Sequence, residues 1–141
     1  MSQVNAKPVR IVMLDDDPED ALLVSTAIKG LEYDVPFQHI QTSQAFTFYL
    51  SEDYMTQSRE SAVILLLDLN MPCKTGLEWL RELRCETQYK DLIIVVFSTS
   101  GMAEERVKSL SLGADDHLGK PDRVQDLTHK LDILCRRYVE Q

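Results

Sequence analysis

The segment from Leu65 to Pro72 reads Leu-Leu-Leu-Asp-Leu-Asn-Met-Pro and places one carboxylate, that of Asp68, at the end of an apolar run. The run begins at Ala62, and its near-continuous hydrophobic content is typical of a central parallel strand covered on both faces. Residues typical of turns follow at once. Because burying a carboxylate costs free energy, Asp68 at this position indicates a functional site.

Two other apolar runs also end in polar side chains. The run Val9–Leu14 is followed by Asp15 and Asp16, and the run that ends at Phe97 is followed by Ser98. In an open parallel sheet the ligand site lies beyond the carboxyl ends of the strands. We therefore expect the following side chains to converge there: Asp15, Asp16, Asp68, Ser98 and Lys120.

Short apolar runs alternate with segments of helical periodicity along the chain, which predicts an α/β fold around a parallel sheet. The expected strands are Val9–Leu14, Val35–Thr42, Ala62–Leu69, Leu92–Ser98 and Asp115–Gly119. The last of these is short and polar, as expected of an edge strand. The expected helices are Pro18–Leu31, Ser43–Leu50, Thr75–Glu86, Met102–Leu112 and Pro121–Tyr138.

Local signals refine the ends of these elements. Asp17 before Pro18 predicts a helix N-cap with proline in the first turn, and Ser43 is the expected cap of the next helix. Gly113 is expected to end its helix. The segment Ser51–Ser61 is polar and unpatterned, which predicts a loop or a frayed helix end.

Size and composition bound the kind of protein. The chain has 141 residues, enough for one domain, and 44% are hydrophobic. Its formal net charge of −8 argues against direct nucleic-acid binding and is compatible with a divalent cation or a basic protein surface. It has no apolar run long enough for a membrane span and no apolar signal peptide at its N-terminus, so we expect a cytoplasmic location. The three cysteines have neither zinc-site nor disulfide spacing.

Five acidic residues crowd the start of the first expected helix. Asp17 is explained as the cap, and Glu19 and Asp20 are explained by the favourable helix dipole. That leaves Asp15 and Asp16 for the predicted site. Together with Asp68 they make three carboxylates whose mutual repulsion a bound cation would relieve, and few oxygen-only ligands suit Mg²⁺.

Lys120 and Ser98 extend this prediction from a metal site to phosphoryl chemistry. An ammonium, a hydroxyl and a cation around Asp68 would form a site for a phosphoryl group carried on that carboxylate. Taken alone, Lys120 could equally be a solvated loop residue.

Five motifs in this order resemble the receiver domains of two-component response regulators of the chemotaxis type. The resemblance covers about residues 9 to 138 and implies a flavodoxin-like (βα)5 three-layer sandwich with strand order 2-1-3-4-5. The matching stretches are Leu14-Asp15-Asp16-Asp17-Pro18, Asp68-Leu69-Asn70-Met71-Pro72 with Gly76, Ser98-Thr99, Gly113-Ala114-Asp115 and Lys120-Pro121.

The resemblance implies roles for the residues of the site. Asp68 would be the phosphoacceptor. Asp16 and Asp68 would bind Mg²⁺ directly, Asp15 through water and Asn70 through its backbone carbonyl, with Mn²⁺ as the alternative ion. Further expected contacts with the phosphoryl group come from Ser98 and Lys120. The donor would be a sensor histidine kinase or a phosphotransfer protein.

The resemblance also implies a switch. Phosphorylation would pull Ser98 inward, shift the following loop and alter the surface formed by residues 102–112, 115–119 and 121–138. That surface would bind an unknown downstream protein or form a homodimer. Two residues depart from the family pattern: Thr99 follows Ser98 where a smaller residue is common, and His117 stands where Tyr or Phe is common. His117 could otherwise be an ordinary surface residue of its strand.

On this reading the chain is a single receiver domain, and not an enzyme beyond catalysing its own phosphorylation and dephosphorylation. Only three residues follow Tyr138, so we expect no output domain in residues 1–141, unless they are a piece of a longer protein. Three alternatives remain. An aspartate-nucleophile phosphatase would need an acid at Asn70, a flavin-binding module lacks its phosphate loop, and a phosphorylation-independent scaffold would take up no phosphoryl group.

Overall fold

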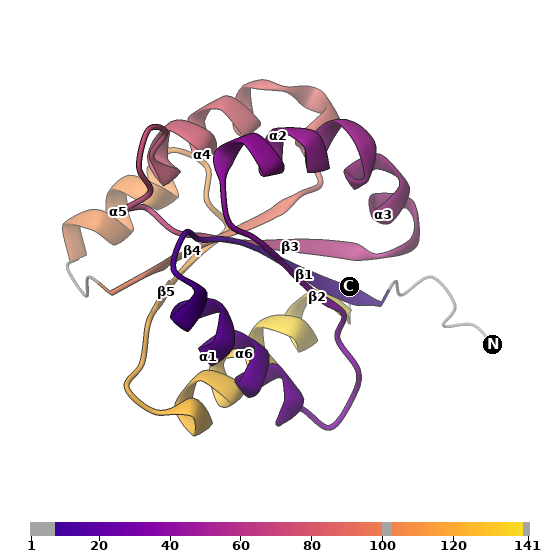
Figure 1. Ribbon diagram of the computed structural model, residues 1–141, viewed down its shortest axis with the longest axis vertical. Helices are drawn as coiled ribbons and strands as arrows, with labels where there is room; N and C mark the ends of the chain where they lie inside the picture. The colour runs from indigo at the N-terminus through magenta and orange to yellow at the C-terminus, as the bar shows by residue number, and fades with distance from the viewer. Residues whose placement is uncertain (1–7, 100–102, 140–141) are drawn as a thin grey trace.

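The computed structural model describes residues 8–99 and 103–139, which form a three-layer α/β sandwich (Figure 1). The central sheet has five parallel strands in the order β2-β1-β3-β4-β5, as predicted, with β5 at one edge. Helices α1 and α6 cover one face, and α2, α3, α4 and α5 cover the other. The strands are β1 (Val9–Leu14), β2 (Phe37–Ile40), β3 (Ala62–Leu67), β4 (Ile93–Ser98) and β5 (Asp116–Gly119). The helices are α1 (Pro18–Lys29), α2 (Ser43–Glu52), α3 (Tyr54–Glu60), α4 (Gly76–Cys85), the 3₁₀ helix η1 (Thr87–Tyr89), α5 (Ala103–Ser111) and α6 (Val124–Val139).

The strand register aligns the carboxyl ends of the central strands. Leu14 pairs with Leu67, and Leu67 pairs with Val96 on the next strand. The residues that follow Leu14 and Leu67 therefore leave the sheet side by side, and these are Asp15 and Asp68.

The sheet separates two hydrophobic cores, because successive side chains of a strand point to opposite faces. On β3, Leu65 and Leu67 pack toward α2 and α4, whereas Ile64 and Leu66 pack toward α1 and α6. All four side chains are fully buried. The central strands are thus covered on both faces, and this packing fixes the strand ends that are followed by the predicted site residues.

The prediction of a loop or frayed end at Ser51–Ser61 was wrong, because α3 forms there. Tyr54 is the buried residue of this helix, and its ring lies 6.5 Å from that of Tyr49 and 5.5 Å from that of Tyr89. One buried side chain in a short helix leaves no repeating apolar stripe in the sequence. The helix is therefore held by tertiary packing and not by a visible periodicity.

The N-cap of α2 is Thr42, and not Ser43 as predicted. The Thr42 hydroxyl accepts a hydrogen bond from the backbone N–H of Ala45 at 3.0 Å. Ser43 already has a place in the helix, and its hydroxyl accepts the indole N–H of Trp79 at 3.0 Å. The predicted cap of α1 is confirmed, since the Asp17 carboxylate accepts the N–H of Glu19.

Trp79 links α4 to the loop that follows β3. Its buried ring meets Phe46 edge to face, with ring centroids 4.8 Å apart. The ammonium of Lys74, in the loop between β3 and α4, lies 3.7 Å from the centroid of the Trp79 ring. The loop after Asp68 is thereby packed against the aromatic core under α2.

Elsewhere the predicted elements differ from the structure at their ends. The last helix begins at Val124 instead of Pro121, and the start predicted at Met102 lies outside the described residues. Gly113 follows α5 with φ of 110°, in the left-handed region that glycine adopts readily. Among the helices of the described residues, none has the length and apolar content to cross a membrane.

Candidate functional site

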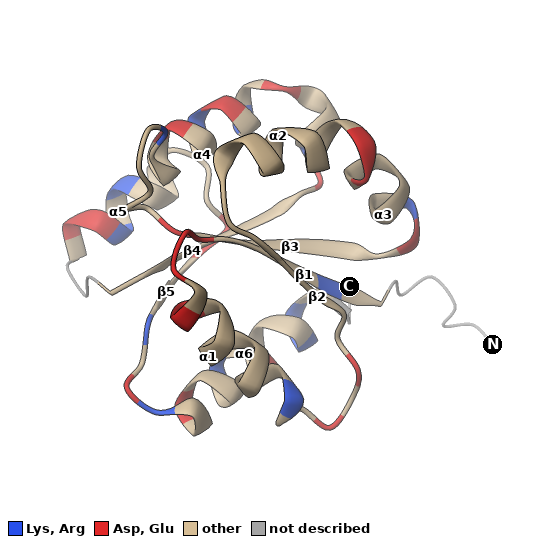
Figure 2. Ribbon diagram, in the orientation of Figure 1, with Lys and Arg blue, Asp and Glu red and all other residues tan. Residues whose placement is uncertain are grey.

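Three carboxylates meet at the carboxyl edge of the sheet, where β1 and β3 end. One oxygen atom from each of Asp15, Asp16 and Asp68 lies within 4.8 Å of the others. Asp15 is fully buried and Asp68 nearly so, whereas Asp16 is exposed. Figure 2 shows acidic residues where β1 passes into α1. The structure therefore brings together the three acids that the sequence placed at one edge.

The backbone holds the two buried carboxylates in fixed positions. The N–H of Asp68 donates to the carbonyl of Leu14 at 3.0 Å, which extends the sheet ladder by one residue. Each carboxylate then accepts the N–H two residues further along: Asp15 from Asp17 at 2.9 Å and Asp68 from Asn70 at 3.2 Å. Such local hydrogen bonds are typical of aspartates in turns and orient both side chains.

Burial makes the charge on these acids costly. Burial raises the pKa of Asp15 to about 6, and the charge of Asp68 adds to this increase. The hydrogen bond from the N–H of Asp17 acts in the opposite direction and lowers the pKa. Burial also raises the pKa of Asp68 above its ordinary value. A divalent cation would remove this cost, and three carboxylate oxygens suit a hard ion such as Mg²⁺ or Mn²⁺. The donor set thus fits the predicted metal.

Lys120, directly after β5, brings a positive charge to the same group of acids. Its Nζ lies 3.9 Å from Oδ1 of Asp68, 3.4 Å from Oδ2 of Asp15 and 2.6 Å from Oδ2 of Asp20. Burial lowers the pKa of Lys120, but the hydrogen bond to Asp20 and the neighbouring carboxylates outweigh it, so the pKa is raised. The side chain is therefore a cation at neutral pH.

Asp20 is the residue that the sequence reasoning missed. The helix dipole explains Asp20 in the sequence, yet its carboxylate lies closer to the Lys120 Nζ than those of Asp15 and Asp68 do. Its position along the chain is the signal that could have identified it. Asp20 lies in the first turn of α1, which begins two residues after Asp16, so this turn stands over the edge of the sheet.

Ser98, Thr99 and Asn70, the other predicted site residues, follow or end strands β4 and β3. Ser98 is fully buried at the end of β4, and its carbonyl accepts the backbone N–H of Lys120 at 2.8 Å. Thr99 follows in an exposed bend. Asn70 is exposed and contacts Asp68 through its backbone N–H, while the predicted use of its carbonyl as a metal ligand stays a prediction.

His117 lies apart from this group, on β5 beneath α5. It is buried, with 8% of its surface exposed, so the alternative of an ordinary surface residue was wrong. Its Nε2 lies 3.1 Å from Oε1 of Glu105 on α5, and its carbonyl accepts a hydrogen bond from Arg106. The imidazole therefore joins strand β5 to helix α5.

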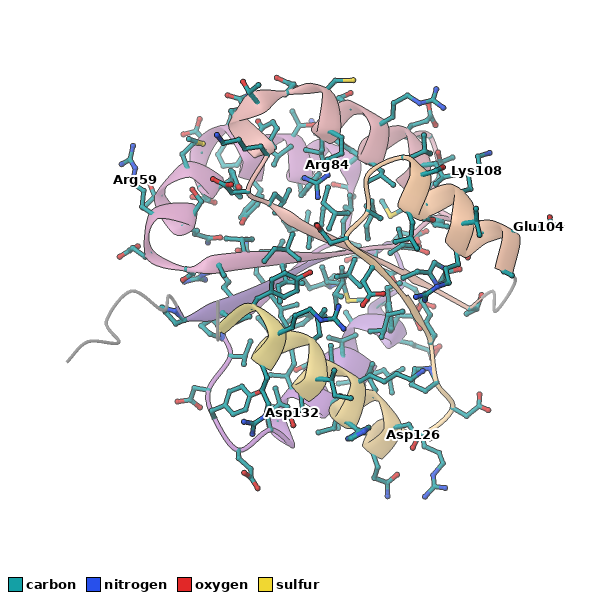
Figure 3. All side chains as sticks on the ribbon, turned by 180° about the vertical axis from the view of Figure 1, so that it is seen from behind. Arg59, Arg84, Glu104, Lys108, Asp126 and Asp132 are labelled. Carbon is teal, nitrogen blue, oxygen red and sulfur yellow. The ribbon has the colours of Figure 1, made fainter. Side chains whose placement is uncertain are left out.

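A second set of contacts fixes the segment that leads into β5. Arg84 on α4, labelled in Figure 3, donates to the carbonyl of Gly113 and to the carboxylate of Asp115, at 2.7 Å each. The same Asp115 oxygen accepts the N–H of Ile94 at the start of β4. The segment between α5 and β5 is thereby tied to α4 and β4.

Comparison with protein families gives a match over residues 11–132 to the model described as the response regulator receiver domain. Among curated proteins, the chain is 33% identical over 132 residues to the response regulator MprA of Mycobacterium sp. (strain KMS), covering 92% of this chain and 52% of that protein. It is 28% identical over 130 residues to the DNA-binding dual master transcriptional regulator RpaA of Synechocystis sp., covering 91% and 49%. The chain spans about half the length of the curated relatives it matches.

Solved structures show the same fold. The Mn²⁺-bound form of response regulator Rcp1 superposes with a TM-score of 0.73 at 25% identity, covering 95% of this chain and 96% of that one. The phosphorylated cyanobacterial phytochrome response regulator RcpA gives 0.74 at 22% identity, covering 92% of each chain. A receiver domain from Rhodospirillum rubrum gives 0.76 at 22% identity and 94% coverage of each. The last two likenesses concern the fold alone.

Proposed function

We propose that this chain, which belongs to the response regulator receiver family of two-component systems, accepts a phosphoryl group on Asp68 and signals to a protein partner. The observation that carries this proposal is the surroundings of Asp68. A nearly buried carboxylate lies in a group of three acids and 3.9 Å from the ammonium of Lys120. Such a site combines a nucleophile with the positive charge that phosphoryl transfer requires.

Mg²⁺, or Mn²⁺ in its place, is the proposed cofactor. Asp16 and Asp68 would hold the ion directly, Asp15 through water and Asn70 through its carbonyl. When bound, the ion supplies positive charge that balances the transferring phosphoryl oxygens. The close approach of three carboxylates supports this proposal, as does the Mn²⁺ named for the similar structure of Rcp1.

The proposed donor is a phosphohistidine on a sensor kinase or a phosphotransfer protein. An oxygen of the Asp68 carboxylate forms a bond to phosphorus while the P–N bond to histidine breaks, and the electron pair leaves with the imidazole. Lys120 neutralises the transferring oxygens, and the Ser98 hydroxyl contacts the phosphoryl group. The chain acts as a signalling acceptor, and not as an enzyme that turns over a separate substrate.

The proposed output surface consists of α5, β5 and α6. A pocket of about 390 Å³ lies there, lined among others by Arg106, His117, Leu118 and Arg137. Ser98 ends β4 and pairs with Gly119 of β5. This pairing supports the proposal that a change at Ser98 and Thr99 alters β5 and α5. A downstream protein, or a second copy of the chain, is the proposed partner of this surface. We propose no direct contact with nucleic acid or membrane, and a cytoplasmic location.

The test is the intact mass of the protein after incubation with acetyl phosphate and Mg²⁺, for the wild type and for Asp68→Asn. We expect one phosphoryl adduct on the wild type and none on the variant. An adduct on both proteins would show that the acceptor is another residue. Absence of an adduct on the folded wild type would contradict the proposal and favour the scaffold alternative.

A further inference from the structure

Among the contacts of Lys120 with Asp15, Asp20 and Asp68, the contact with Asp20 is the shortest. The Lys120 Nζ lies 2.6 Å from Asp20, within ordinary hydrogen-bond distance, but 3.9 Å from Asp68, which is too long for a hydrogen bond. Only 9% of the Lys120 side chain is exposed. The ammonium thus donates to Asp20 and, at the longer distance of 3.4 Å, to Asp15, but not to the proposed acceptor.

The backbones on both sides of this contact are fixed. Asp20 lies in the first turn of α1, three residues after the N-cap residue Asp17. The N–H of Lys120 is held by the carbonyl of Ser98, and the preceding Gly119 pairs with Ser98. A change in the position of the ammonium therefore requires only rotation of the Lys120 side chain, over the ring of Phe97, whose centroid is 5.3 Å away.

We propose that Asp20 is a positioning residue that holds the Lys120 ammonium away from Asp68 and so leaves the Asp68 oxygens open to a divalent cation. The inference rests on the proposed function, because it concerns the same acceptor. Without the Asp20 carboxylate, the ammonium is drawn further toward Asp15, to which it already donates at 3.4 Å, and toward Asp68 at 3.9 Å. There it occupies the carboxylates that the cation needs, and the two positive charges compete.

A double-mutant cycle on Mg²⁺ binding tests this role. The four proteins are the wild type, Asp20→Asn, Lys120→Met and the double variant, each titrated with MgCl₂ while amide chemical shifts are followed. We expect Asp20→Asn to weaken Mg²⁺ binding about fivefold when Lys120 is present, as is usual for coupling between contacting residues. In the Lys120→Met background we expect the same change to have less than about a twofold effect, because no ammonium remains to compete.

A control separates this role from a simple loss of negative charge. Glu19→Gln removes one charge from the neighbouring, exposed position of the same helix turn, and we expect it to leave Mg²⁺ binding nearly unchanged. If Asp20→Asn weakens binding by the same factor with and without Lys120, Asp20 acts through its field alone and the proposal is wrong. Asp20→Ala is measured in parallel, so that poor folding of one variant does not remove the test.

The two proposals can fail separately. If the wild type takes up a phosphoryl group but the cycle shows no coupling, only the role of Asp20 is refuted. If the wild type takes up no phosphoryl group but the cycle shows coupling, the acceptor assignment fails and the role of Asp20 in cation binding stands. A wild type without saturable Mg²⁺ binding would refute the role of Asp20, since there would be no cation for Lys120 to exclude.

Discussion

The Nε2 atom of His117 on β5 lies 3.1 Å from a carboxylate oxygen of Glu105 on α5. His117 is buried, and only 24% of the Glu105 side chain is exposed. This contact joins an edge strand to the helix beside it, on the surface that we propose changes with phosphorylation. His117 stands where the family pattern commonly has an aromatic residue, and in this structure the position is held by a hydrogen-bonding contact with α5.

Glu105→Gln should lower the free energy of unfolding by about 1 kcal/mol, because a carboxylate acceptor is replaced by a neutral amide at a partly buried hydrogen bond. Urea denaturation measures the change. Glu104, which Figure 3 labels on the same helix, is exposed, and Glu104→Gln is the matched control with an expected change near zero. Equal effects of the two substitutions would mean that the contact with His117 contributes nothing.

Gly76→Ala should destabilise the protein by about 3 kcal/mol and slow phosphoryl uptake. A Cβ atom at Gly76 would lie 2.3 Å from the carbonyl oxygen of Asp68, a backbone atom that cannot move without shifting the acceptor. Gly119→Ala is the control, because a Cβ there meets nothing within 4 Å, and its expected effect is within about 0.5 kcal/mol. Thermal unfolding and intact mass would be measured on both variants; a stable, fully active Gly76→Ala protein would contradict the close packing seen here.

Asp16→Ala should weaken Mg²⁺ binding about tenfold or more, since ligand charge sets the affinity of such sites. The stability of the metal-free protein should not fall, because a like charge leaves the neighbourhood of Asp15 and Asp68. Isothermal titration with MgCl₂ gives the affinity. Asp17→Asn is the control: it removes an adjacent charge but keeps a good helix cap, and normal binding by Asp16→Ala would exclude Asp16 as a ligand.

The stability of the metal-free protein should rise as the pH falls from about 6 to about 4. The folded-state pKa of Asp15 is raised from 3.8 to about 6, so ionised Asp15 destabilises the fold above pH 6 and this cost disappears on protonation. At roughly 1.4 kcal/mol for each unit of pKa, the cost is about 3 kcal/mol. Urea denaturation in EDTA measures the trend.

The same titration predicts how metal stabilisation depends on pH. Mg²⁺ should raise the melting temperature more at pH 7.5 than at pH 5, because protons compete with the ion for the carboxylates. Asp15→Asn should reduce the pH dependence between 4 and 6, and Asp68, whose pKa is also raised, should contribute the rest. A melting temperature that responds equally to Mg²⁺ at both pH values would show that Asp15 is not coupled to the ion.

The sequence located the site because its residues obey a rule of sheet geometry. Asp15 and Asp68 follow apolar runs directly, and parallel strands bring such positions to one edge whatever their separation along the chain. Lys120 is placed in the same way by β5, whose final residue pairs with Ser98. The strand order itself came from the family resemblance, and the structure agrees with it.

What the sequence did not reveal depends on tertiary contacts. Asp20 had a sufficient local explanation in the helix dipole, so nothing in the sequence required its partnership with a residue 100 positions away. Helix α3 has one buried residue, Tyr54, and its neighbours are rings from other elements. His117 lies in a short polar strand, yet it is buried and its Nε2 contacts Glu105 of α5.

The placement of Trp79 gives the protein an intrinsic optical reporter. It is the sole tryptophan, it is buried against Phe46, and the ammonium of Lys74 lies over its ring. Lys74 belongs to the loop that starts at Asp68, the proposed acceptor, and a cation close to an indole alters its emission. Fluorescence of the unlabelled protein should therefore follow rearrangement of that loop in real time, and stopped-flow mixing with a phosphoryl donor could record the event without a dye or an isotope.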